Sequence, residues 1–223
     1  MKFFIMIFLS LILAYGSDKD CKSVDIMGTN ELIFAADSLN LKRFATALDG
    51  CNAKDVYALR FKGSDLLDMA IEGNFAPIVQ YLLEKYPRFS LDEHRIFKYV
   101  SKDSINYKDP EMIELLLNFG KFSINVTDAE GKTILHHIVY DPQIFEIKYV
   151  LSKGIDTTLK DNEGLDALST AKKWLTFHQE MDAKHPWAET KKRIARVQKA
   201  IALIEDYNAQ REKKMVDRCN RII

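Results

Sequence analysis

The sequence predicts an all-α fold, a solenoid of about four to five helix-turn-helix units with a helical cap at its C-terminal end. The main observation is an internal repeat, in which the stretch Gly131–Val139 recurs in altered form at Gly63–Ile71 and Gly164–Ala171. The leucines that align in these units are 35, 68 and 33 residues apart, and 68 is two repeats: Leu32, Leu67, Leu135 and Leu168. Such a period indicates stacked helical hairpins. Glycine (9) and proline (5) are sparse in the 223 residues, as long helices with few loops require.

The composition indicates which classes of partner the protein could bind. Hydrophobic residues make up 47% of the chain, which is ordinary for a folded globular protein. Lys+Arg and Asp+Glu are both 32, so the formal net charge is zero. Proteins that bind nucleic acids usually carry a basic excess, and we therefore expect no nucleic-acid partner.

The fourth unit carries the clearest motif. Within residues 128–136 (DAEGKTILH), Gly131 suits a turn that needs a positive φ, and Thr133 stands where a helix N-terminus needs a capping oxygen. Within residues 152–161 (SKGIDTTLKD), Gly154 stands where a left-handed residue would end the second helix. These stretches resemble the D-x-x-G-x-T-P-L-H opening and the K-x-G-A-D-V-N-A-x-D close of ankyrin repeats.

The resemblance extends over residues 28–172, about two-thirds of the chain. The second unit, residues 63–83, matches nearly as well, and the first keeps its apolar helix positions. The third unit is degenerate: its first helix is expected at about 94–101, its second at 111–119, and residues 102–110 look like an inserted loop. The fifth unit opens well at residue 161, and its helix then runs on past the family pattern.

Residues 173–223 do not resemble ankyrin repeats. A helix over residues 188–214 would place four aliphatic side chains on one face, among lysines, arginines and glutamates: Ile194, Val197, Ile201 and Ile204. We interpret residues 173–223 as a helical cap and tail that cover the exposed end of the array. The alternative is a partner-binding or membrane-surface element, but charges that alternate in sign suit water better than anionic lipid.

Residues 1–16 have the pattern of a cleaved signal peptide. Lys2 precedes an apolar run that is too short to span a bilayer, and small residues lead to a predicted cleavage between Gly16 and Ser17. Residues 17–27 would then form an N-terminal lead-in. The prediction is a periplasmic or secreted protein without stable membrane insertion after cleavage; the alternative is an uncleaved anchor.

Export would place the three cysteines, Cys21, Cys51 and Cys219, in an oxidising compartment. An odd number allows at most one internal bridge. Cys21–Cys51 is the favoured pair, because Cys21 opens the mature chain and Cys51 closes the hairpin of the first repeat. The alternative is three unpaired thiols.

Signals for catalysis, cofactors and metals are weak. The nucleophile elbow, phosphate-binding glycine loop and zinc-protease motifs do not occur, so we expect no catalytic, cofactor-binding or metal-binding residues. His136 and His137 are adjacent and would point about 100° apart on a helix. His136 fills the family's own histidine position, which implies a bond to the backbone of a neighbouring loop. His178 and His185 are weak metal candidates.

The resemblance implies protein binding through loop tips and the first helices. The positions of this sequence that match those variable sites are Lys62, Ser64, Glu72, Ala129, Glu130, Lys132, Tyr140, Asp141, Asn162, Glu163 and Leu165. Tyr140 is the favoured hot spot, since exposed aromatic rings anchor interfaces well. The alternative is that Tyr140 packs on the neighbouring repeat.

The functional prediction is an exported, non-catalytic module that is monomeric alone and binds another protein. Small exported ankyrin proteins resemble immunity proteins that neutralise toxins in the bacterial periplasm. A second hypothesis is a secreted effector that captures host proteins. A third, an enzyme that uses the C-terminal helical region, has little support from the sequence.

Overall fold

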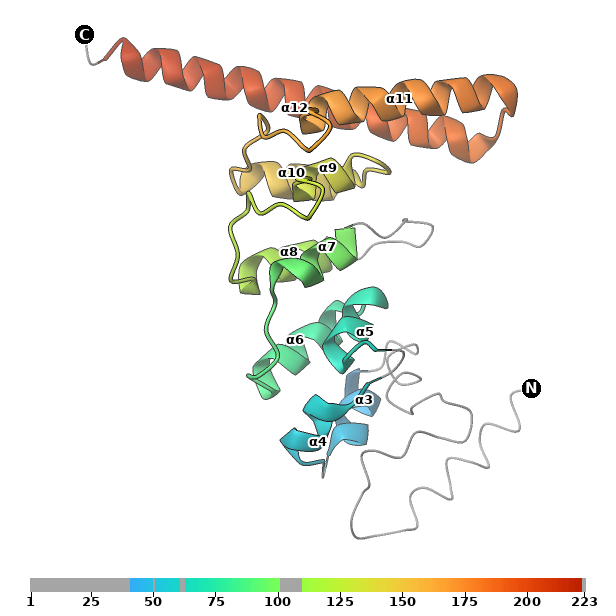
Figure 1. The fold of residues 1–223 in the computed structure, drawn as a ribbon, viewed down its shortest axis with the longest axis vertical. Helices are drawn as coiled ribbons and strands as arrows, with labels where there is room; N and C mark the ends of the chain where they lie inside the picture. Colours follow the sequence, from blue (N-terminus) through green and yellow to red (C-terminus); the bar gives the residue numbers. More distant parts are fainter. Residues whose placement is uncertain (1–40, 50, 61–62, 101–109, 222–223) are drawn as a thin grey trace. The chain divides into compact units, whose positions relative to one another are not determined.

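The structure is a computed structural model that describes residues 41–49, 51–60, 63–100 and 110–221 (Figure 1). The chain divides into two compact units, Met1–Phe89 and Ser90–Ile223. The predicted signal peptide, the lead-in, Cys21 and the first helix of the first repeat lie outside the described residues. Helices dominate both units, as the repeat period predicts.

The described helices of the first unit are α3 (Leu41–Leu48), α4 (Ala53–Ala58), α5 (Leu66–Glu72) and α6 (Ala76–Lys85), of which α5 and α6 pack together as a helical hairpin. The side chain of Asp65 caps α5 by accepting from the backbone N–H of Asp68. Asn74, with φ of 61°, lies in the turn between α5 and α6. The apolar faces of these helices close a core of Phe44, Leu48, Val56, Leu67, Ile71, Ile78, Val79 and Leu82.

Helix α4 is absent from the sequence prediction. It begins where the side chain of Asn52 accepts from the backbone N–H groups of Lys54 and Asp55, and it buries Val56. Tyr57 on the same helix packs edge-on against Phe89, with 5.0 Å between ring centroids. One turn of helix with a single buried aliphatic residue is too short to produce a periodic pattern.

The second unit is a two-layer stack of helical hairpins (Figure 1). Its helices are α7 (Glu93–Val100), α8 (Pro110–Phe119), α9 (Ile134–Ile138), α10 (Ile144–Ser152), α11 (Ala167–Lys184) and α12 (Ala188–Cys219). The first helices α7, α9 and α11 pack in one layer, and the second helices α8, α10 and α12 pack in the other. The predicted third unit is confirmed in α7 and α8, despite its missing glycine turn.

The C-terminal cap is a long helical hairpin of α11 and α12. Val197, Ile201 and Ile204 are buried, as the predicted apolar face requires. Helix α11 runs through the predicted boundary at residues 172/173, because no helix-breaking residue interrupts it before Pro186. The fifth repeat and the cap therefore share one helix.

Candidate protein-binding surface

Two hairpin tips of the second unit have the same backbone structure. Antiparallel bridges pair Thr127 with Thr133 and Lys160 with Asp166, and each encloses a five-residue tip. In the first tip, Asp128 Oδ1 accepts from the backbone N–H groups of Glu130 (3.0 Å) and Lys132 (2.8 Å). In the second, the corresponding donors to Asp161 Oδ1 are Glu163 (2.9 Å) and Leu165 (3.0 Å).

A glycine with positive φ completes each tip, Gly131 at 74° and Gly164 at 77°. This is the left-handed region that glycine adopts without steric cost. The repeated Asp-x-x-Gly spacing in the sequence is therefore a turn in which the aspartate binds backbone amides and the glycine reverses the chain. The prediction for Gly131 is confirmed.

The two tips are joined to each other. The backbone N–H of Asn162 donates to the carbonyl of Glu130 at 2.9 Å, and its side-chain amide donates to the carbonyl of Ala129 at 3.2 Å. Asn162 lies 33 residues from Ala129, so these bonds connect consecutive repeats. The side chains of Ala129, Glu130, Asn162 and Glu163 remain exposed, while Lys132 and Leu165 are half-buried.

His136 belongs to the scaffold, as predicted. Its Nδ1 accepts from the backbone N–H of Thr133 at 3.1 Å, while the Thr133 hydroxyl caps α9. Its Nε2 lies 3.0 Å from the carbonyl oxygen of Leu165 in the next repeat. Because Nδ1 accepts, Nε2 must carry the proton and donate to that carbonyl.

His137 points elsewhere and binds Asp128 instead. Its Nε2 lies 2.6 Å from Asp128 Oδ2, and its ring is tilted against Phe97 at 5.4 Å. Burial lowers the pKa of His137, although the Asp128 carboxylate opposes the effect. Burial would raise the pKa of Asp128, but hydrogen bonds from the Lys132 N–H and from His137 outweigh it and lower that pKa. The adjacent histidines thus diverge, which confirms the prediction that they do not converge on one ion.

Tyr140 packs on the neighbouring repeat. Its ring meets Trp174 of α11 edge-on at 4.4 Å between centroids, and the guanidinium of Arg193 lies 6.0 Å from its centroid. The side chain is half-buried rather than freely exposed. This geometry supports the packing alternative.

Asp141 requires a correction, because it does not lie on the exposed surface. Its side chain is 4% exposed, and its Oδ1 lies 2.7 Å from Nη2 of Arg196 and 3.3 Å from Nε of Arg193. Both arginines come from α12. Arginines of the cap therefore bind the Asp141 carboxylate, which was expected to face a partner.

The remaining predicted positions lie in the first unit. The hydroxyl of Ser64 donates to Glu72 Oε1 at 3.4 Å, and both side chains are half-buried. Lys62 lies outside the described residues. Ser64 and Glu72 thus bond to each other in the first unit, while the other described positions belong to the second unit.

An exposed apolar surface on α11 was missed in the sequence. Phe177 is 45% exposed and Met181 is 40% exposed, one helical turn apart. Phe177 also packs edge-on against Trp174 at 5.6 Å. Because α11 runs on past the family pattern, these residues have no counterpart in the motif; only their i, i+4 spacing could have indicated them.

The described residues contain no group of three or more His, Cys, Asp or Glu side chains that could hold a metal ion. No helix among them is long and apolar enough to cross a membrane. His178 is buried, whereas His185 is exposed at the end of α11. Cys51 is disulfide-bonded and Cys219 is a free, exposed thiol. Since Cys21 lies outside the described residues, the Cys21–Cys51 pairing stays a prediction.

Similarity to known proteins is local in sequence. No family model matches the chain. A segment of 63 residues, 28% of the chain, is 38% identical to the ADP-ribosylation factor GTPase-activating protein AGD2 of Arabidopsis thaliana, and spans 8% of that protein. The ankyrin repeat domain of Bcl-3, a unique member of the IkappaB protein family, superimposes with a TM-score of 0.49 at 19% identity, covering 74% of this chain and 72% of that one.

The resemblance to ankyrin repeats lies in the chain's own repeat geometry. Helical hairpins recur at the ankyrin period, with an aspartate-glycine turn at each tip and a Thr-x-x-His capping box in the best unit. The histidine of that box bonds the next repeat, as the family motif implies. In this geometry the chain resembles ankyrin-repeat proteins.

Proposed function

We propose that the chain is an exported, non-catalytic module that binds a protein on the hairpin-tip surface, which we define as Ala129, Glu130, Lys132, Asn162, Glu163 and Leu165. Ankyrin repeats are protein-binding modules, and the observation that supports this surface is the bonded pair of tips. Asn162 ties the second tip to the carbonyls of Ala129 and Glu130.

Rigid tips favour binding because little conformational entropy is lost when a partner docks. Each tip has its aspartate bound to two backbone amides. The exposed carboxylates of Glu130 and Glu163 then stand at set positions, with Glu163 held 2.7 Å from the ammonium of Lys173. A pre-organised surface of this kind reduces the free-energy cost of association.

A non-catalytic role is supported by the chemistry of the histidines. Nδ1 and Nε2 of His136 are both engaged with the scaffold, and His137 is bound to Asp128. Three of the four ring nitrogens are thus engaged with the chain itself, whereas general-base catalysis needs a nitrogen that can take a proton from a nucleophile.

Export is supported by the composition of residues 1–16 and by the disulfide at Cys51, since disulfides persist in oxidising compartments. Within that setting we propose an immunity role, in which the tips bind a toxin that enters the periplasm. A one-to-one complex recovered from periplasm, and death of a deletion strain beside its kin, are the expected results. Recovery of the chain in host lysate would instead favour the effector hypothesis.

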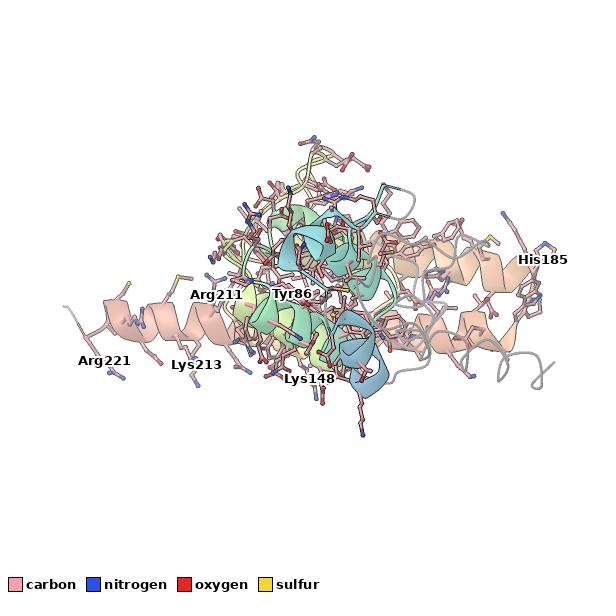
Figure 2. All side chains as sticks on the ribbon, turned by 90° about the horizontal axis from the view of Figure 1, so that it is seen from below. Tyr86, Lys148, His185, Arg211, Lys213 and Arg221 are labelled. Carbon is pink, nitrogen blue, oxygen red and sulfur yellow. The ribbon has the colours of Figure 1, made fainter. Side chains whose placement is uncertain are left out.

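The test of the surface is a charge-reversal pair. The variant E130K/E163K changes both exposed tip carboxylates, and we expect it to weaken capture of the protein partner at least tenfold. K148E is the matched control, because Lys148 is exposed on α10, the second helix of the same repeat (Figure 2). Equal capture by wild type and E130K/E163K, with both correctly folded, would remove the tips from the proposed interface.

A further inference from the structure

The last part of α12 extends past the helices of its own unit (Figure 1). Its last hydrogen bonds to the described part of the repeats run from the Thr157 hydroxyl to Asn208 Oδ1 at 2.5 Å and from the Tyr207 hydroxyl to the carbonyl of Ile155 at 3.4 Å. Every residue from 209 to 221 is exposed. We call residues 211–221 the α12 extension; Figure 2 shows Arg211, Lys213 and Arg221 along it.

The α12 extension carries an apolar stripe. Met215 and Val216 are 57% and 58% exposed, and Cys219 follows one turn later as a free, exposed thiol. Met215 and Cys219 continue, at helical spacing, the face that Ile201 and Ile204 bury against the repeats. The face is polar at Asn208 and Glu212 and becomes apolar again at Met215, where the helix is exposed. The exposed apolar residues of the α12 extension are therefore not needed to cover the end of the repeats.

The same segment is basic. It holds five cationic side chains, against only Glu212 and Asp217: Arg211, Lys213, Lys214, Arg218 and Arg221. Among the described residues, Arg211 alone of these five has an acidic neighbour within 4 Å, namely Asp156 at 3.9 Å.

The first half of α12 differs in this respect. There Arg193 and Arg196 bind Asp141, and Lys192 lies 3.4 Å from Glu189. Charge is thus largely compensated where the helix packs on the repeats, and uncompensated where it leaves them.

We propose that the α12 extension binds an anionic lipid surface as a peripheral amphipathic helix. The stripe of Met215, Val216 and Cys219 would enter the boundary between headgroups and acyl chains, and the flanking lysines and arginines would contact the lipid phosphates. An exposed apolar stripe beside basic residues is the pattern of helices that lie in the membrane interface. The positive charge of the α12 extension favours an anionic lipid surface over a second copy of the chain. Two copies would bring two segments of the same sign together, which costs free energy. The proposal does not depend on the hairpin-tip surface.

The experiment is co-sedimentation of the purified full chain with vesicles of phosphatidylcholine alone and with phosphatidylglycerol added. We expect at least tenfold stronger binding to the anionic vesicles and a loss of that binding in high salt. The variant K213E/K214E/R218E should lose at least tenfold of the affinity, and M215S/V216S should lose severalfold. All these positions are exposed, so the fold should persist, which circular dichroism checks.

The matched control is K191E/K199E, which reverses two exposed lysines on the packed half of α12 and should bind within twofold of wild type. All variants share residues 1–16, so any membrane affinity of that segment is common to them. A fluorophore on Cys219 that reports polarity should shift to the blue on anionic vesicles.

Three results would overturn the proposal. One is equal binding of wild type to neutral and anionic vesicles. Another is binding that neither the charge-reversal nor the serine variant reduces. The third is a dimer under reducing conditions that M215S/V216S dissociates, because the stripe would then be covered by a second copy.

Discussion

Arg196 and Asp141 lie 55 residues apart in the chain, yet Nη2 of Arg196 is 2.7 Å from Oδ1 of Asp141. Arg193 approaches the same oxygen at 3.3 Å with its Nε. The carboxylate is almost fully buried, so it must be paired to remain charged there. This contact joins the turn after α9 to the first half of α12.

The first prediction concerns this buried carboxylate. D141N keeps the shape of the side chain but removes its charge. Arg193 then loses this carboxylate, and Arg196 keeps Glu189, whose Oε1 is 3.4 Å from its Nη1. We expect the free energy of unfolding to fall by about 2 kcal/mol, less than for a fully buried pair because the arginines are about a quarter exposed. Urea unfolding followed by tryptophan fluorescence measures it, since Trp174 and Trp187 both belong to the cap region.

An exposed ion pair provides the control for D141N. Lys172 and Glu205 lie 2.8 Å apart between α11 and α12, with both side chains about half exposed. E205Q should change stability by less than about 1 kcal/mol, as is usual for surface pairs. A loss as large in E205Q as in D141N would mean that burial of Asp141 is not the cause.

The second prediction concerns pH and His178. Burial lowers the pKa of His178, with Arg193 and Arg196 adding to the effect while the Tyr140 carbonyl and Asp141 oppose it. The unfolded chain therefore takes up a proton near the ordinary value of 6.5, whereas the folded chain resists it until lower pH. Stability from the neutral ring is complete above that value and is lost as the pH falls through the lowered pKa.

We expect the free energy of unfolding to decrease from pH 7.5 to pH 5 more steeply in the wild type than in H178Q, which cannot titrate. Urea midpoints at several pH values measure the two slopes. Parallel curves would show that His178 takes up its proton equally in both states.

Much of the fold follows from local signals. The repeat period and the turn glycines predict the hairpins of both units, and the Thr133 cap and the His136 contact follow from the motif, because each depends on residues a few positions away or on a partner one repeat along. Helix α4 could not be predicted, since a single turn has no measurable period.

The candidate surface was only partly predictable for a related reason. The tip positions follow from the aspartate-glycine turn, which fixes where Glu130 and Glu163 stand. Asp141 and, in one of two interpretations, Tyr140 were expected to be exposed, because they match variable positions of the family pattern. Their partners Trp174, Arg193 and Arg196 lie in the segment without a motif, so only tertiary packing shows that these positions are occupied.

The third prediction concerns His136. H136A removes the acceptor of the Thr133 N–H, which is left buried, and one donor to the Leu165 carbonyl, which keeps the Asp161 N–H at 2.9 Å. We expect a loss of about 2–4 kcal/mol in the free energy of unfolding. H185A, at an exposed position, should stay within about 0.5 kcal/mol of wild type. If H136A unfolds at the same urea concentration as wild type, the histidine does not stabilise the contact between repeats.

The fourth prediction compares the two tip glycines. An added Cβ at Gly164 would meet no atom within 4 Å, so G164A should cost about 1–2 kcal/mol from its positive φ alone. At Gly131 the same Cβ would lie 2.8 Å from Asn162 Oδ1 and 3.2 Å from its backbone N. G131A must therefore also displace the residue that joins the tips, and we expect it to cost at least about 1 kcal/mol more than G164A, since overpacking adds to backbone strain. Urea unfolding of both variants measures the difference. Equal losses would mean that the tips separate without cost, and the rigidity on which the proposed binding surface depends would then be absent.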